Sequence, residues 1–146
     1  MINYKTYTSI VKPDSTEIEA VVSFLYKHLD EYGDDKVDIE KAILYAVKDE
    51  PVGGGFVLVA RDNDEILGSV VINRTGMEGY IPENILVYIA VHESQRGKGL
   101  GKGLMNEVIK ISKGDIALHV EPENPARFLY EKVGFSSKYV EMRLKK

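Results

Sequence analysis

The chain has 146 residues, a formal net charge of −4 and no cysteine. This length predicts a single domain spanning residues 1–146, and the balance of 44% hydrophobic and 29% charged residues is typical of a globular protein. The lack of cysteine excludes a thiol nucleophile, a thiolate zinc site and any disulfide. The net negative charge argues against non-specific nucleic-acid binding, so we expect any bound anion to be held by a local feature.

No apolar run reaches the roughly 18 residues of a membrane span, and the first residues lack the pattern of a secretory signal. We therefore expect a cytoplasmic protein with no membrane partner.

In the first half of the chain, two helices follow a weak strand at residues 2–8. The sequence Asp14-Ser15-Thr16-Glu17 predicts a capping box, in which the side chains of Asp14 and Glu17 each accept from a backbone amide of the other. The helix that follows ends near Gly33. A second helix is expected from about Asp38, and Pro51 with the glycines after it ends this helical half.

The second half is richer in strands. Residues 56–60 and 66–73 predict a hairpin, and the apolar run 85–91 predicts a central strand covered on both faces. We then expect a helix over 99–113, a strand over 115–120, a helix over 125–133 and a last strand ending at 144. The element order β-α-α-β-β-β-α-β-α-β predicts a mixed α/β (α+β) fold.

A glycine-rich segment, residues 95–103, lies between the central strand and the helix after it. Glycines leave backbone amides unshielded, and the positive end of the helix dipole favours an anion there. Arg96, Lys98 and Lys102 add positive charge, so the segment predicts a phosphate or pyrophosphate cradle. It is not a Walker A loop, because only three residues separate Gly97 from Gly101-Lys102 and no hydroxyl residue follows. The spacing of a dinucleotide fingerprint is absent as well.

Two motifs carry a resemblance to a known family. Arg96-x-x-Gly99-x-Gly101 is followed, at the expected distance, by a segment that begins at Asn124 and continues through Ala126 and Tyr130 to Gly134-Phe135. With these motifs the sequence resembles the GNAT superfamily of acyl-CoA-dependent N-acetyltransferases. The resemblance implies a mostly antiparallel central sheet flanked by helices. It also implies an enzyme that needs no metal and transfers an acetyl group directly from acetyl-CoA to a primary amine.

The resemblance also implies roles for individual residues. The backbone of the central strand would line the pantetheine arm, with the Ile89 N–H donating to the thioester carbonyl, and Asn124 would contact the same arm. Tyr130 would protonate the departing thiolate as general acid. The residues implied in cofactor binding are Ile89, Ala90, Val91, Gln95, Arg96, Gly97, Lys98, Gly99, Leu100, Gly101, Lys102, Asn124 and Tyr130.

The general base stays open. Many family members place a glutamate in the central strand, and this position holds Ile85 here, which cannot accept a proton. Glu83 lies two residues earlier and faces the same side of an extended chain. His119 on the next strand, or a chain of water molecules, is an equal alternative.

Several features have competing interpretations. Asn124 is also a suitable helix N-cap, and Tyr130 a suitable core residue. The acidic residues between 30 and 38 form either a solvated turn or a site for a cationic amine, and the loop 74–84 is a second candidate wall for the acceptor. We expect the acceptor to be a small-molecule or peptide amine. We expect the protein to be a monomer or a homodimer, and the final strand is a candidate for pairing across a dimer. The rival function is a non-catalytic acyl-CoA-binding module.

Overall fold

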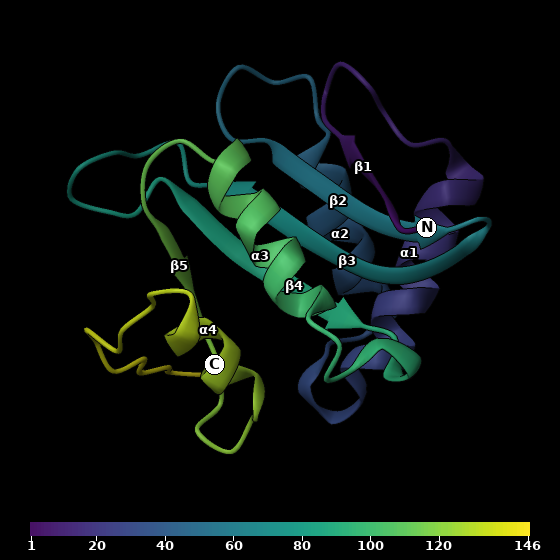
Figure 1. The fold of residues 1–146 in the computed structure, drawn as a ribbon. Helices are drawn as coiled ribbons and strands as arrows, with labels where there is room; N and C mark the ends of the chain where they lie inside the picture. Colours follow the sequence, from purple (N-terminus) through teal and green to yellow (C-terminus); the bar gives the residue numbers. More distant parts are fainter.

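The computed structural model describes residues 1–146 and contains one five-stranded sheet with helices on both faces (Figure 1). The strand order is β1-β2-β3-β4-β5; the first four strands are antiparallel, and β5 runs parallel to β4. This confirms the predicted fold class. The elements are β1 Asn3–Tyr7, α1 Ser15–Leu29, the 3₁₀ turn η1 Asp30–Tyr32, α2 Lys36–Ala46, β2 Gly55–Asp62, β3 Glu65–Arg74, β4 Asn84–Val91, the 3₁₀ turn η2 Glu93–Gln95, α3 Leu100–Ile111, β5 Ile116–Leu118 and α4 Ala126–Lys132.

Each face of the sheet carries its own hydrophobic core. Helices α1 and α2 pack on one face, where Leu25, Ile39 and Ile43 are almost fully buried against β2, β3 and β4. Helices α3 and α4 pack on the other face, around Leu104 and Met105. The central strands are covered on both sides, which explains their continuous apolar sequence. None of the helices combines the length and apolar character that crossing a bilayer requires.

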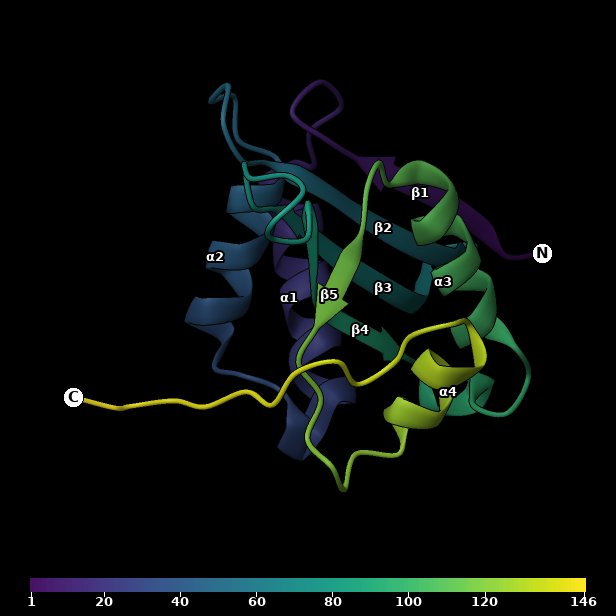
Figure 2. The ribbon, with the colours of Figure 1, turned by 90° about the vertical axis from the view of Figure 1, so that its left-hand side faces the viewer.

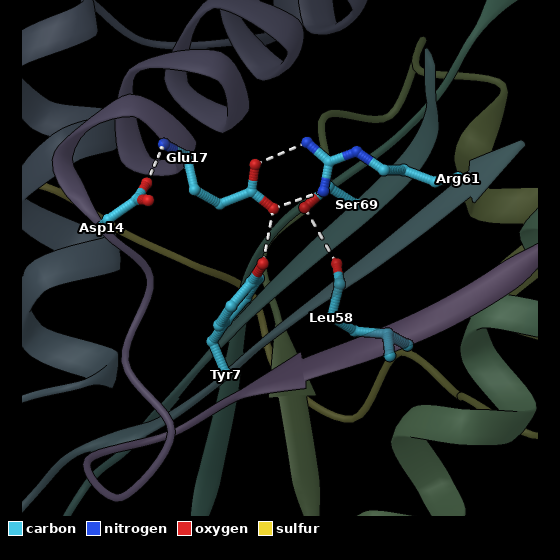
Figure 3. A network of polar contacts seen from close by, with 6 residues as sticks. All are labelled: Tyr7, Asp14, Glu17, Leu58, Arg61 and Ser69. Atoms are coloured by element: carbon cyan, nitrogen blue, oxygen red, sulfur yellow. Dashed lines mark hydrogen bonds and ion pairs between the residues drawn. The ribbon is translucent and has the colours of Figure 1, made fainter. Parts of the chain in front are cut away.

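The start of α1 is held by an ion pair as well as by its cap (Figure 3). The Glu17 N–H donates to the side chain of Asp14 at 2.8 Å, as expected for the N-cap. The reciprocal half of the predicted capping box is wrong, because the Glu17 carboxylate pairs with Arg61 of β2 and accepts from the Tyr7 hydroxyl at 2.7 Å. A guanidinium offers two charge-assisted donors where a backbone amide offers one neutral donor.

Strand β4 contains an irregularity that changes its partners. Its register with β3 shifts by one residue, from Ile72↔Leu86 to Val71↔Tyr88, so Val87 is the extra residue of a β-bulge. Side chains follow the shift: Leu86 packs on the α3 face, whereas Val87 and Tyr88 both pack on the α1 and α2 face. The pairing of β4 with β5 ends at Leu86↔Leu118, immediately before the bulge.

The predicted last strand is absent from the structure. Residues 136–146 belong to no helix or strand and donate no backbone hydrogen bond to the rest of the chain. The β-type alternation of apolar residues is present in this segment, but an isolated strand needs a partner for its backbone groups. Strand β5 is also shorter than the expected 115–120, and α2 begins at Lys36 rather than near Asp38.

The ion pair at Glu17 predicts a specific pH dependence of stability. The hydrogen bonds from Arg61 and Tyr7 lower the pKa of Glu17 despite its burial. Because the folded-state pKa lies below the unfolded value, this stabilisation is present above about pH 4.3 and is lost as the pH falls through the folded pKa. The Glu17→Gln variant should lose about 1–3 kcal/mol at pH 7, since the charged hydrogen bonds disappear.

Chemical unfolding between pH 2 and 7 measures this effect. The difference in unfolding free energy between the wild type and Glu17→Gln should shrink toward low pH. Glu19→Gln, on an exposed position of the same helix, serves as the control and should leave the curve unchanged. A difference that stays constant across this range would contradict the assignment of the pH dependence to Glu17.

Candidate functional site

The segment between β4 and α3 forms an open loop. His92 caps η2, since its Nδ1 accepts from the Ser94 N–H at 3.1 Å. Gly97 and Gly99 have φ of 76° and 86°, a backbone conformation that residues with a Cβ rarely adopt. A Cβ on either glycine would meet no atom within 4 Å, so the loop is unobstructed at these two positions.

The first turn of α3 presents free amide donors. The N–H groups of Gly99, Leu100, Gly101 and Lys102 have no protein acceptor, and the Gly103 N–H, which donates to the Gly99 carbonyl at 3.0 Å, is the first with a helical partner. Lys98 and Lys102 are exposed and form no ion pair. Together with the helix dipole, this arrangement suits a phosphate or pyrophosphate group.

Two of the four glycines in the segment 95–103 are needed for close packing, which the sequence analysis did not predict. A Cβ on Gly101 would lie 3.1 Å from Leu129 of α4, and a Cβ on Gly103 would lie 2.8 Å from the Tyr4 hydroxyl of β1. Gly101 and Gly103 therefore let α3 approach its neighbours closely. Only Gly97 and Gly99 serve the conformation of the loop itself.

Beyond the bulge, one edge of β4 is free. The His92 N–H donates to the Leu67 carbonyl of β3 at 2.8 Å, whereas the Asn84 N–H, before the bulge, donates to Asp115 on the β5 side. Alternation along a strand then directs the backbone groups of Ile89 and Val91 away from β3, toward the side where β5 has diverged. These groups lead directly to the glycine loop and offer a second chain an edge to pair with.

Tyr130 lies on α4, belongs to the same hydrophobic cluster as Ile89 and Val91, and is 8% exposed. Its ring packs against Phe135, with the ring centroids 5.9 Å apart, and its hydroxyl has no hydrogen-bond partner in the protein. Burial raises the pKa of Tyr130 to about 12, so the phenol is protonated at neutral pH. Tyr130 belongs to the hydrophobic core on the α3 face, as one of the two interpretations of the sequence predicted. Its hydroxyl group is still available as a hydrogen-bond donor.

Two other predicted cofactor residues make structural contacts. The Asn124 Oδ1 accepts from the Ala126 N–H at 2.9 Å and so caps the start of α4, which leaves its NH₂ group as a donor. The Arg96 guanidinium donates to the His28 carbonyl at 3.3 Å and thereby links the glycine loop to the end of α1. The His28 ring lies against the His92 ring, with the centroids 4.6 Å apart and the planes tilted by 42°, and burial lowers the pKa of His28.

The structure separates the candidate bases. The carboxylate of Glu83 accepts from the Asp115 N–H at 2.7 Å and the Gly79 N–H at 2.9 Å, which lowers the pKa of Glu83 and makes it a weaker base. Glu83 and the loop 74–84 lie at the start of β4, the end opposite to the glycine loop (Figure 1). His119 immediately follows Leu118, the residue at which β5 parts from β4, and its side chain is exposed.

The acidic residues around η1 line a cavity of about 470 Å³. Asp34 is fixed by the Tyr88 hydroxyl of β4, which donates to it at 2.6 Å, and burial together with this bond raises the pKa of Tyr88. The Tyr32 hydroxyl of η1 donates to the Glu123 carbonyl at 3.4 Å and connects this region to the loop between β5 and α4. The carboxylates that line the cavity are those of Asp30, Asp34, Asp35 and Asp38.

Comparison with known proteins agrees with this geometry. The acetyltransferase (GNAT) domain family matches residues 53–137. A predicted acetyltransferase from Clostridium acetobutylicum, solved with acetyl-CoA, superimposes with a TM-score of 0.71 at 17% identity, covering 98% of this chain and 96% of that one. A ribosomal-protein-alanine N-acetyltransferase from Brucella melitensis biovar Abortus 2308 has a TM-score of 0.66 at 17% identity, covering 100% and 99%.

A third similar structure is a transcriptional regulator from Bacillus halodurans C-125, with a TM-score of 0.69 at 19% identity and complete coverage of both chains. No curated protein sequence matches this chain significantly. At these identities the solved structures show the fold alone, whereas the family match spans more than half of the sequence. The chain therefore belongs to the GNAT acetyltransferase family.

Proposed function

We propose that this protein is an N-acetyltransferase that moves the acetyl group of acetyl-CoA directly to a primary amine of its acceptor. The observation that carries the proposal is the row of free amides from Gly99 to Lys102, placed at the end of the free edge of β4. A phosphate site joined to an unpaired strand edge matches the two chemical parts of CoA, a pyrophosphate and an amide-containing arm.

In this proposal the chain's own groups hold the cofactor. The amides of Gly99 to Lys102 donate to the pyrophosphate, and Lys98 and Lys102 balance its charge. The free backbone groups of Ile89 and Val91 pair with the pantetheine arm. The Ile89 N–H donates to the thioester carbonyl, where negative charge develops as the amine attacks.

Tyr130 acts on the leaving group. Its phenol is protonated and unpartnered, so it can donate a proton to the thiolate as the C–S bond breaks. The chain has no cysteine that could carry the acyl group, which favours direct attack by the amine over a cysteine acyl-enzyme. An alkylamine with a pKa of about 10.4 is almost entirely protonated at neutral pH and must lose a proton first. Of the candidate bases, His119 has the more suitable position, at the divergence of β4 and β5.

The acidic cavity supplies the proposed acceptor site. Asp34 and Asp35 would attract a cationic acceptor, such as a diamine or a basic peptide, to the side of β4 that carries Tyr88. The acidic cavity lies on the face of the sheet that α1 and α2 cover. The hydrogen bond from the Tyr32 hydroxyl to the Glu123 carbonyl bounds the cavity on the side of β5.

Binding of the cofactor is tested by thermal shift with acetyl-CoA, CoA and ATP. Gly99→Ala places a Cβ in the open loop at a φ of 86°, and Gly79→Ala does the same at a φ of 81° in the loop before β4. The free energy of unfolding should fall by a similar amount in both variants, about 1–2 kcal/mol. Only Gly99→Ala should lose the stabilisation by acetyl-CoA and CoA, because only this Cβ enters the phosphate site.

Two outcomes would change the assignment. If neither CoA species stabilises the wild type, the proposed function is wrong. If both bind but a broad panel of amines releases no free thiol, the non-catalytic acyl-CoA-binding module replaces the enzyme.

The Tyr130→Phe variant tests the general acid. We expect kcat to fall by about 10- to 100-fold, at or below the low end of general-acid effects, because a thiolate needs its proton less than an amine would. Binding of CoA should be unchanged, since the ring and its packing remain. Tyr139→Phe, which removes another phenol without a hydrogen-bond partner, should have full activity. A Tyr130→Phe enzyme with wild-type kcat would remove this residue from the mechanism.

The acidic cavity is tested by neutralising Asp34 and Asp35 together as asparagines. An asparagine oxygen can still accept from the Tyr88 hydroxyl, so the fold is kept. The KM for a diamine acceptor should rise about 5- to 20-fold with little change in kcat, and the effect should shrink at high salt. Neutralising Asp62, at the end of β2, and Asp64, in the turn that follows, is the matched control. An equal KM for the wild type and the Asp34/Asp35 variant would exclude this cavity from acceptor binding.

A further inference from the structure

The two ends of the glycine loop are held by different means. At its far end the loop continues into α3, whose first residue, Leu100, is 6% exposed and belongs to the core. At its near end β4 stops at Val91, and the glycines that follow, Gly97 and Gly99, are free to adopt many backbone conformations. The free amides therefore keep one position only if the turn η2, between β4 and Gly97, is itself held in place.

His92 holds the start of this turn through three groups. Its N–H donates to the Leu67 carbonyl of β3 at 2.8 Å, and its carbonyl accepts from the Gln95 N–H at 2.8 Å. The Nδ1 atom of its ring accepts from the Ser94 N–H at 3.1 Å. Because a backbone N–H can only donate, Nδ1 carries no proton in this arrangement. One residue thus joins the edge of the sheet to two successive amides of η2.

The end of α1 supports the turn from the other side. The His28 ring, which lies against that of His92, also packs on Phe24, with the ring centroids 4.5 Å apart. Phe24 is 7% exposed and belongs to the core on the α1 and α2 face (Figure 2). Arg96, at the end of the turn, donates to the carbonyl of the same His28. The last turn of α1 therefore contacts η2 at both of its ends.

We propose that His92 is a positioning residue for the pyrophosphate of CoA, because its Nδ1 holds the turn that fixes the free amides of the glycine loop. The inference rests on the proposed function, since it concerns the same loop. His92 acts through the backbone of the turn, whereas Arg96 also brings a charge to the site. A loop that is fixed in advance loses less conformational entropy when the ligand binds, so the affinity for CoA depends on this hydrogen bond.

Three substitutions of His92 separate the hydrogen bond from the packing of the ring. His92→Asn keeps an acceptor, because an asparagine oxygen accepts readily from the N–H two residues on. His92→Phe keeps a ring against His28 but has no acceptor, and His92→Ala has neither. The Kd for CoA should rise about 3- to 30-fold in His92→Ala and His92→Phe, the range for the loss of a capping hydrogen bond. In His92→Asn it should stay within about 2-fold of the wild type.

NMR titration with two ligands distinguishes a positioning role from damage to the fold. CoA contains the pyrophosphate, whereas pantetheine is the arm alone, and the arm is proposed to pair with the free edge of β4. The Kd for pantetheine should therefore be the same in the wild type and in all three variants. General damage would weaken the binding of both ligands. Equal thermal unfolding of the variants shows that they fold.

Thr8→Ala is the matched control. The Thr8 Oγ1 accepts from the N–H groups of Ile10 and Val11 at 3.1 and 3.3 Å, in the loop after β1, at the end of the sheet away from η2 (Figure 1). This variant also loses side-chain acceptors for amides of a turn, and it should bind CoA as the wild type does.

The outcomes separate this inference from the proposed function. An unchanged Kd for CoA in His92→Ala, or an equal rise of the Kd for CoA and for pantetheine, would overturn the positioning role alone. A loss of affinity in His92→Asn as large as in His92→Phe would overturn it as well. A wild type that binds no CoA would overturn the proposed function, and this inference with it.

Discussion

The bulge at Val87 is the feature on which the proposed site depends. A regular β4 would continue its parallel pairing with β5 and would leave no free backbone on that side. One extra residue reverses which backbone groups face β3, and the edge that results leads from Ile89 to the glycine loop. The same shift directs Tyr88 to the α1 and α2 face, where it holds Asp34. The edge proposed for the cofactor and the wall proposed for the acceptor are thus two sides of one irregular strand.

The glycines of the loop between β4 and α3 have two different structural roles. Gly97 and Gly99 supply a left-handed backbone conformation, and Gly101 and Gly103 supply close packing against α4 and β1. The link from Arg96 to the His28 carbonyl fixes the loop from outside. The free amides are therefore held in place before any ligand arrives, which reduces the entropy that binding must overcome.

Periodicity and motif spacing predicted most of the fold, including the glycine loop between β4 and α3. Three details depended on contacts between distant residues and were beyond such patterns. Glu17 pairs with Arg61 rather than with a backbone amide, because the two meet only once β2 lies beside α1. Glu83 is engaged by the amides of Gly79 and Asp115, which disfavours it as a base. The last strand has the right alternation, but a local pattern does not indicate whether a partner strand exists.

When a binding loop uses main-chain donors, its backbone conformation determines which ligand it binds, and the identity of its side chains matters less. The amides of Leu100 and Lys102 point at the site whatever residues stand there, provided that Gly97 and Gly99 keep their dihedral angles. The amide donors themselves are therefore kept when a side chain changes, as long as the glycines and Arg96 hold the loop in this conformation. The proposed acceptor site depends on individual carboxylates, so in this proposal new substrates can arise there while the glycine loop stays as it is.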